Sequence, residues 1–260
     1  MKIGIIGFGY VGSAVAASYS DDNIMVNDPQ YPQQSVDLSE IKKKCSAIFI
    51  CVPTPSDKQG QCDVSILQDV IKSLRGFTGV VISKSTAPPQ VYTQLEKSSK
   101  LKLAHVPEFL TQARAKVDYV NPHKILVGCE KKIRGRVTEV ILGSDVNFDR
   151  VKIEYCSIAE ASFFKYMANN MLAMKVMMCN ELHALSQEMG LDWHTITNIA
   201  RTDDRLGNTH WAVPGPDGLK GFGGACFPKD TRALQHLGQT YSVAQPVLDC
   251  VIATNAKYRD

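Results

Sequence analysis

Two side chains on one predicted helix have the types and spacing of a pair that could handle protons. Lys165 and Asn169 are four residues apart and share one face of that helix. Their neighbours are apolar: Phe163, Phe164, Met167, Met171 and Leu172. A lysine partly removed from water is suited to proton transfer or to contact with an oxyanion. The spacing also allows a surface lysine whose stem lies along the helix, beside an exposed asparagine.

A second chemical candidate is Cys226, which follows a glycine-rich stretch. Pro228 suits the first position of a helix and Asp230 its first turn. A thiol at a helix N-terminus, next to Lys229, favours the thiolate that a nucleophilic cysteine needs. The alternative is a buried cysteine beside an aspartate that only complements the helix dipole. The preceding glycines allow close approach of a ligand, which favours the nucleophile.

A third pattern is a glycine motif of the kind that binds dinucleotides. Gly7-Phe8-Gly9-Tyr10-Val11-Gly12 directly follows a predicted strand and precedes a helical segment. Such glycines permit a tight turn and place a pyrophosphate at the helix N-terminus. The next strand ends in Asp28, sixteen residues after Gly12, where a carboxylate can bind the ribose hydroxyls. Because Pro29 and Gln30 carry no positive charge to offset a 2′-phosphate, the pattern predicts NAD rather than NADP.

The elements around these residues predict an α/β fold. Short apolar runs alternate with amphipathic segments such as 64–74 and 91–97, and the runs lie at 3–6, 24–26, 47–52, 80–83, 101–105, 124–127 and 151–153. This alternation predicts an N-terminal Rossmann-like domain, a doubly wound parallel sheet over residues 1–154. An all-helical central domain over residues 155–260 is expected to follow. It begins with one long helix, 158–189, ended by Gly190, and a second helix capped by Asp192.

Composition excludes several classes of protein. The 260 residues carry 29 basic and 26 acidic side chains, a balance that predicts neither nucleic-acid nor membrane partners. We find neither a signal peptide nor an apolar run of about 20 residues that could cross a membrane, and we expect a cytoplasmic protein. The eight cysteines include no C-x-x-C pair and no histidine at ligand spacing, so we expect neither disulfides nor a metal site.

Further motifs extend over nearly the whole chain. In order they are Val52-Pro53-Thr54-Pro55 followed by Asp63, Ser85-Thr86-Ala87-Pro88, Pro107-Glu108-Phe109-Leu110, Lys165-Tyr166-Met167-Ala168-Asn169, Lys175, Asn180-Glu181, Asp204-Arg205 and the segment Gly221–Asp230. With the dinucleotide turn, this set resembles the UDP-glucose/GDP-mannose dehydrogenase family. The segment Gly221–Asp230 is the most specific of these motifs.

The resemblance implies a four-electron oxidation of the 6-hydroxyl of a nucleotide sugar, with two NAD consumed and UDP-glucose as the expected substrate. Cys226 would capture the intermediate aldehyde as a thiohemiacetal, and a thioester would then be hydrolysed. Lys165 and Asn169 would stabilise the oxyanions, and Glu108 would assist thioester hydrolysis. Asp230 and Thr86 would hold the water or the proton relay.

The resemblance also implies which residues hold the ligands. The expected cofactor contacts are Gly7, Gly9, Tyr10, Val11, Gly12, Asp28, Val52, Pro53, Thr54 and Thr86. The expected substrate contacts are Phe109, Leu110, Lys165, Asn169, Arg205, Gly221, Phe222, Gly223 and Gly224, with Arg205 reaching the substrate across a dimer.

The chain departs from the family pattern in several places. It ends at Asp260, so we expect a short form without the C-terminal domain that grips the nucleotide. Gln112 stands where many members have a second glutamate, and Lys124 where an arginine is common. The segment 214–220 lengthens the loop before the glycines.

Two other functions stay open at this point. A one-step 3-hydroxyacid dehydrogenase would share the spacing of Lys165 and Asn169 but would need no cysteine. A non-catalytic or partner-dependent NAD-binding subunit would fit the short chain. We also expect a homodimer through the helical domain, because the last predicted helix, from 243 to about 257, would otherwise expose Val243, Val247, Val251 and Ile252.

Overall fold

The computed structural model describes residues 1–57, 60–149 and 151–259, which form two compact units. One unit contains Met1–Pro55 and Cys62–Lys165, and the other contains Ser56–Gln61 and Tyr166–Asp260. The helix α7 (Ile158–Glu188) begins in the first unit and continues into the second. The domain boundary after residue 154 that the sequence suggests stays a prediction.

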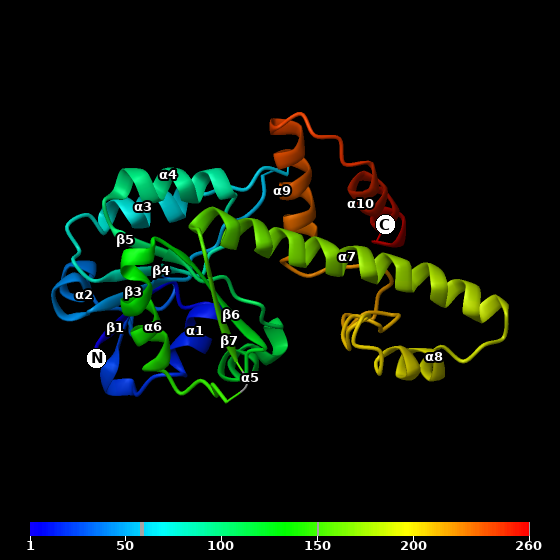
Figure 1. Cartoon of the computed structure of the whole chain (residues 1–260), viewed down its shortest axis with the longest axis horizontal. Helices are drawn as coiled ribbons and strands as arrows, with labels where there is room; N and C mark the ends of the chain where they lie inside the picture. Colours follow the sequence, from blue (N-terminus) through cyan, green and yellow to red (C-terminus); the bar gives the residue numbers. More distant parts are fainter. Residues whose placement is uncertain (58–59, 150, 260) are drawn as a thin grey trace. The chain divides into compact units, whose positions relative to one another are not determined.

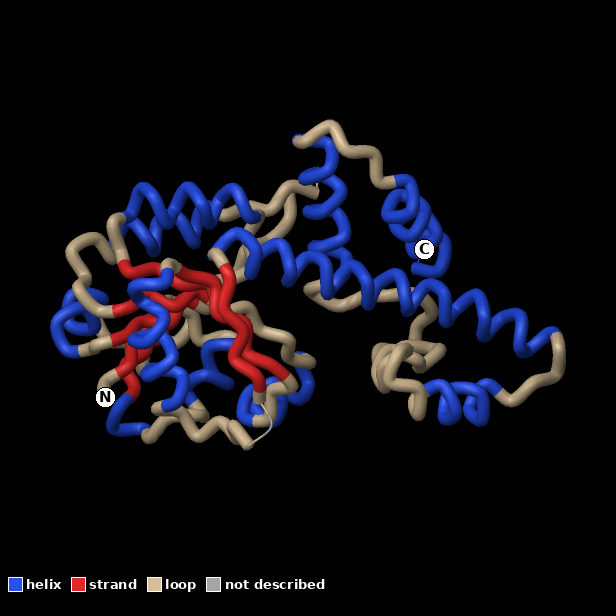
Figure 2. The backbone as a smooth tube through the Cα atoms, in the orientation of Figure 1, coloured by secondary structure: helices blue, strands red, loops and turns tan. Residues whose placement is uncertain are grey.

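A seven-stranded sheet forms the centre of the first unit (Figures 1 and 2). The strand order is β2-β1-β3-β4-β5-β6-β7. The strands are β1 (Ile3–Ile6), β2 (Ile24–Asn27), β3 (Ala47–Ile50), β4 (Val80–Ser83), β5 (Lys102–His105), β6 (Lys124–Cys129) and β7 (Lys152–Cys156). All four residues of β1 and all four residues of β3 are buried, as expected of parallel strands covered on both faces.

One pairing departs from the wholly parallel sheet that the sequence predicts. β6 runs antiparallel to β5, and β7 is parallel to β6. The connection between the two strands contains the helix α5 (Ala115–Val120). Because the pairing is antiparallel, β6 starts on the side of the sheet where β5 stops.

Helices cover both faces of this sheet, which confirms the predicted fold class. They are α1 (Tyr10–Ala16), α2 (Leu38–Lys44), α3 (Ser65–Ser73), α4 (Pro89–Ser99), α5 and α6 (Arg134–Leu142). Alternate residues of a strand pack into two separate hydrophobic cores, one on each face of the sheet. Ile5 and Phe49 pack with Val137 of α6, whereas Ile48 packs with Leu67 of α3.

The second unit is helical in the part of the chain that the structure describes. It contains most of α7, then α8 (Trp193–Ala200), α9 (Phe227–Thr240) and α10 (Pro246–Arg259). Gly190 follows α7 with a φ of +67°, and the Asp192 carboxylate caps α8 by accepting from the His194 and Thr195 amides. The end of α7 at Gly190 and the start of α8 at Asp192 confirm the predictions. Ala173, Met177 and Phe222 form the small core.

His105 makes the first unit sensitive to acid. Its ring is fully buried, stacks on Tyr92 with centroids 4.3 Å apart, and donates from Nδ1 to the Ser83 carbonyl at 3.0 Å. Burial lowers its pKa to about 3. Because the unfolded chain protonates near pH 6.5 and the folded chain does not, stability is lost as pH falls below 6.5.

We therefore expect the free energy of unfolding to fall by about 2–3 kcal/mol more in the wild type than in His105→Phe between pH 7 and pH 4.5. The Ser83 carbonyl keeps the Val106 amide as a donor in that variant. Urea unfolding at the two pH values measures the difference, and parallel pH dependence in the two proteins would contradict it.

Candidate active site

The dinucleotide turn joins β1 to α1, and its three glycines serve different purposes. Gly7 has a φ of +89°, and a Cβ there would lie 2.6 Å from the Cys51 carbonyl oxygen. A Cβ at Gly12 would lie 2.0 Å from the Gly7 carbonyl oxygen. At Gly9, no heavy atom of the described chain lies within 4 Å of the Cβ position, so the open side of the turn is at Gly9. Among the residues that the structure describes, no side chain caps α1 and no acidic residue lies in its first turn, which leaves its amides for a phosphate.

Asp28 lies at the end of β2 with its carboxylate already oriented. Oδ2 accepts from the Phe8 amide at 2.5 Å and Oδ1 from the Gln30 amide at 2.7 Å. Tyr10 and Val11, between Gly9 and Gly12 of the dinucleotide turn, start α1 and are half-buried. An open glycine turn, uncapped helix amides and a fixed carboxylate at the neighbouring strand end fit an adenine dinucleotide with free ribose hydroxyls.

This carboxylate should decide the choice of dinucleotide. We expect the wild type to bind NAD in strong preference to NADP, because a 2′-phosphate would face the Asp28 charge, and like charges brought together cost several kcal/mol. Asp28→Ala should weaken NAD binding and reduce the preference by about tenfold or more. Calorimetric titration of both proteins with both dinucleotides measures this. An unchanged preference in Asp28→Ala would contradict the assignment.

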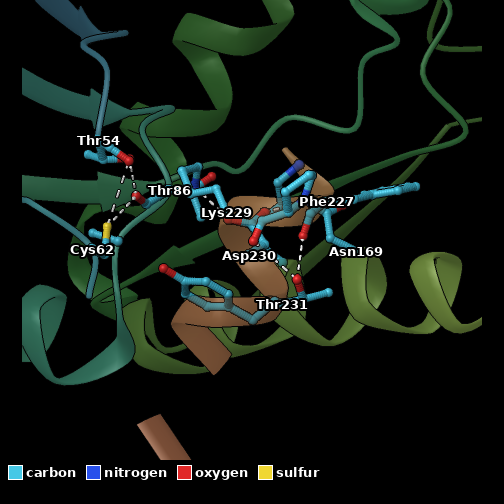
Figure 3. A network of polar contacts seen from close by, with 12 residues as sticks. Thr54, Cys62, Thr86, Asn169, Phe227, Lys229, Asp230 and Thr231 are labelled. Atoms are coloured by element: carbon cyan, nitrogen blue, oxygen red, sulfur yellow. Dashed lines mark hydrogen bonds and ion pairs between the residues drawn. The ribbon is translucent and has the colours of Figure 1, made fainter. Parts of the chain in front are cut away.

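The loops after β3 and β4 meet beside this turn. Thr54 Oγ1 donates to the Thr86 carbonyl at 2.6 Å, and Ser85 Oγ donates to the Val52 carbonyl at 2.7 Å. The Cys62 thiol lies 3.9 Å from the Thr54 carbonyl and 3.8 Å from that of Thr86 (Figure 3). Two segments that the sequence assigns to the cofactor, 52–54 and Thr86, are thereby held together at the carboxyl ends of adjacent parallel strands, where open α/β sheets bind ligands.

Glu108 and Lys165 form a buried ion pair in the first unit. Lys165 Nζ lies 3.0 Å from Glu108 Oε1 and donates to the Glu108 carbonyl at 2.6 Å. The Leu110 amide donates to Glu108 Oε2 at 2.7 Å. The Phe109 ring lies 5.3 Å from Lys165 Nζ and 5.1 Å from Lys124 Nζ. Lys165 is 3% exposed, so the alternative of a surface lysine does not hold.

Lys84 is a buried cation that the sequence motifs do not single out. It follows β4, lies 8% exposed, and places Nζ 5.1 Å from the centre of the Tyr119 ring. Burial lowers its pKa to about 8, although the interactions with Cys51 and Glu108 act to raise it. The sequence feature that could have identified Lys84 is its position directly after a buried strand of mainly apolar residues. A lysine is rarely buried in this way unless its charge is paired or has a function.

In the second unit, Asp230 is the centre of a polar network. Its Oδ2 accepts from Asn169 Nδ2 at 2.6 Å, and its Oδ1 lies 2.5 Å from Lys229 Nζ (Figure 3). Asn170 Nδ2 donates to the Asp230 carbonyl at 3.2 Å. Asp230 is 1% exposed, so it does more than complement the dipole of α9. Half-buried Cys226 is the N-cap of α9, and its carbonyl accepts from the Asp230 amide at 2.8 Å.

Arg205 lies in an exposed loop and pairs with Asp203 at 2.6 Å. Lys175 of α7 holds this loop by donating to the carbonyls of Leu206 and Thr209 at 3.0 and 2.6 Å. Its Nζ also lies 3.8 Å from the Trp211 ring centre.

The predicted catalytic residues lie in two groups. The structure places Glu108, Phe109 and Lys165 together in the first unit, and Asn169, Asp230 and the start of α9 together in the second.

Neither a metal site nor a membrane-spanning helix is found in the described ranges, 1–57, 60–149 and 151–259. No three His, Cys, Asp or Glu side chains there are grouped so that they could hold a metal ion. No helix in the same ranges has the length and apolar content to cross a membrane.

The fold and these residues define an NAD-binding oxidoreductase with a Rossmann-like domain. Family models for the UDP-glucose/GDP-mannose dehydrogenase family match both parts of the chain, the NAD binding domain over residues 30–144 and the central domain over residues 159–257. The chain belongs to the UDP-glucose/GDP-mannose dehydrogenase family. This confirms the resemblance and the cofactor that the sequence predicts.

Individual relatives agree with this assignment. The UDP-glucose 6-dehydrogenase of Rickettsia bellii is 28% identical over 98% of this chain and 67% of its own length. The putative UDP-glucose 6-dehydrogenase YtcA of Bacillus subtilis is 30% identical over 92% of this chain and 64% of its own length. The UDP-glucose dehydrogenase structure from Pyrobaculum islandicum has the same fold, with a TM-score of 0.81 at 24% identity, over 98% of this chain and 68% of that one. The chain thus spans about two thirds of these relatives.

Proposed function

We propose that this protein is an NAD-dependent nucleotide-sugar 6-dehydrogenase that converts the 6-hydroxyl of a sugar such as that of UDP-glucose into a carboxylate. The observation that carries the proposal is Cys226 at the N-terminus of α9, in a segment whose Asp230 is bound by Asn169 and Lys229. A one-step dehydrogenase would need no nucleophile at that position.

The proposed reaction has two oxidations separated by a covalent step. NAD, when bound, accepts one hydride in each oxidation. In the first, the 6-hydroxyl loses its proton and carbon C6 loses a hydride, which leaves an aldehyde. Cys226 Sγ then adds to the carbonyl carbon while the thiol proton goes to the carbonyl oxygen, which gives a thiohemiacetal. Loss of the proton from that oxygen and of the second hydride from C6 leaves a thioester. Water adds to the thioester, and the acid leaves as the thiol is restored.

The other residues have roles that match their surroundings. Lys165 supplies a buried positive charge, and Asn169 supplies amide donors, for the oxyanions that form in both halves of the reaction. Glu108 assists the attack of water on the thioester, with its carboxylate oriented by Lys165 and the Leu110 amide. Asp230 and Thr86 hold the water or relay the proton. Phe109, Leu110, Arg205 and the segment Gly221–Gly224 contact the sugar nucleotide.

The test is to count NADH formed per substrate consumed by the purified chain, with UDP-glucose, UDP-N-acetyl sugars, GDP-mannose and a set of 3-hydroxyacids. Two NADH per sugar, with a uronic acid as product, are expected. One NADH per substrate, with a 3-hydroxyacid as the active substrate, would replace the proposal by a simple dehydrogenase. NAD binding without turnover on any sugar would favour a partner-dependent subunit.

We also propose that the protein is a homodimer through the helical unit. Exposed apolar side chains lie along one face of α7 at intervals of three, four or seven residues: Met167, Met171, Met178, Leu182 and Leu185, with Met189 directly after the helix. On α10, Val247 is exposed as well. A continuous apolar stripe of this length on a helix is typical of a surface covered by a partner.

For the dimer we expect light scattering after size exclusion to give twice the 28.6 kDa of one chain. Met178→Glu should shift the protein toward the monomer, because it places a charge within the stripe. Gln187→Glu, which adds the same charge on another exposed face of α7, should leave the mass unchanged. A monomeric wild type would refute the dimer.

A further inference from the structure

The glycine-rich stretch before Cys226 is held by asparagines from two helices. We name residues Gly221–Cys226 the nucleophile loop. The Gly221 amide donates to Asn180 Oδ1 of α7 at 3.0 Å. Asn255 of α10 accepts from the Phe222 amide at 2.7 Å and donates to the Phe222 carbonyl at 3.0 Å. Both backbone groups of Phe222 are therefore bound by one side chain, which fixes the peptide planes on either side.

Arg259, in the last turn of α10, adds a charged contact to the same loop. Its Nη2 donates to the Gly221 carbonyl at 3.0 Å, and its Nη1 lies 2.6 Å from Asp217 Oδ2. Asp217 belongs to the segment 214–220, which lengthens the chain just before the loop. One guanidinium thus holds the extra segment and the start of the nucleophile loop together, in the forked geometry that arginine favours.

The glycines show how closely these side chains approach. A Cβ at Gly221 would lie 2.5 Å from Asn255 Oδ1, and a Cβ at Gly223 would lie 2.6 Å from Arg259 Nη1. Gly224 has a φ of +76°, and no heavy atom in the described ranges lies within 4 Å of its Cβ position. Gly221 and Gly223 are therefore needed to admit Asn255 and Arg259, and the open side of the loop is at Gly224.

We propose that Asn255 and Arg259 are positioning residues that fix the nucleophile loop so that Cys226 meets the sugar in a reactive geometry. The proposal rests on the proposed function, since it assigns a purpose to contacts around the same nucleophile. On the other side of Cys226, the Phe227 ring packs against the buried Phe222 ring, with centroids 6.2 Å apart. The thiol thus lies between two anchored points, and misplacing a reacting group by about 1 Å can cost up to about a hundredfold in rate.

The first test needs neither NAD nor sugar. Asn255→Leu and Arg259→Met are made in the full chain, with Lys257→Met as the control, because Lys257 is an exposed cation in the same last turn. Iodoacetamide labels the cysteines, and mass spectrometry of tryptic peptides gives a rate for each. The Gly221–Lys229 peptide contains Cys226 alone.

We expect Cys226 to react about threefold faster or more in both variants, because the half-buried thiol is released, while buried Cys179 stays protected. Lys257→Met should match the wild type. Unchanged labelling of Cys226, or equal acceleration of Cys226 and Cys179, would overturn the proposal, since the second result would mean general unfolding.

The second test measures turnover of the sugar that the wild type oxidises. We expect kcat to fall by about tenfold or more in Asn255→Leu and Arg259→Met with the KM for NAD unchanged, and Arg259→Lys to recover part of the loss. Faster labelling with an unchanged kcat would overturn the positioning role. If the wild type oxidises no sugar, the proposed function fails, while the labelling result still decides whether these residues hold the loop.

Discussion

Cys226→Ala is expected to abolish formation of the uronic acid while leaving NAD binding intact. Without the thiol, the aldehyde from the first oxidation cannot form a thiohemiacetal. The species that gives up the second hydride is therefore missing. Loss of a catalytic nucleophile lowers turnover by about a thousandfold or more in well-studied hydrolases. Because Cys226 lies in the second unit, far in sequence from the dinucleotide turn, the NAD affinity should not change.

Cys250→Ala is the matched control, since Cys250 is an exposed thiol on α10. The measurement is the rate of acid formation by chromatography, together with NADH formed per sugar. Cys250→Ala should behave as the wild type does. A Cys226→Ala protein that still forms the acid at a rate within tenfold of the wild type would mean that the oxidation proceeds without a thioester.

Lys165→Met is expected to lower the free energy of unfolding by about 3 kcal/mol or more, because removing one partner of a buried pair leaves an uncompensated charge. Lys165 and Glu108 are 3% and 7% exposed, and of the partners that the described residues offer, the Glu108 carboxylate would retain the Leu110 amide and the more distant charge of Lys84. Such a loss is a large share of the roughly 5–15 kcal/mol that typically stabilises a domain.

The double variant Lys165→Met with Glu108→Gln separates stability from chemistry. The amide oxygen that Glu108→Gln introduces would still accept from the Leu110 amide, and no unpaired carboxylate would remain. At least half of the lost stability should therefore return while activity stays lost. Urea unfolding of the single variants, the double variant and the wild type provides the energies. A double variant as unstable as Lys165→Met would show that the loss comes from packing around the lysine stem rather than from the buried charge.

Local patterns were sufficient for much of the fold. The strand runs, the turn at Gly7–Gly12, the end of α7 at Gly190 and the cap at Asp192 all depend on neighbours within a few residues, and the structure has them as predicted. The same holds for the start of α9, where Pro228 and Asp230 lie in the first turn. Such signals persist in any tertiary context because they act through the backbone itself.

The candidate site shows which features local sequence patterns do not predict. The sequence by itself determined which residue types carry the chemistry: the dinucleotide glycines, Asp28, Lys165 with Asn169, and Cys226 in its segment. Only the tertiary structure decided that Lys165 is buried against Glu108, 57 residues away, and that Asn169 holds Asp230, 61 residues away. It also distinguished Gly224, which is open, from Gly221 and Gly223, whose space Asn255 and Arg259 occupy. The physical reason is that burial, ion pairing and the room left for a Cβ are set by atoms distant in sequence, and no periodicity or spacing along the chain records them.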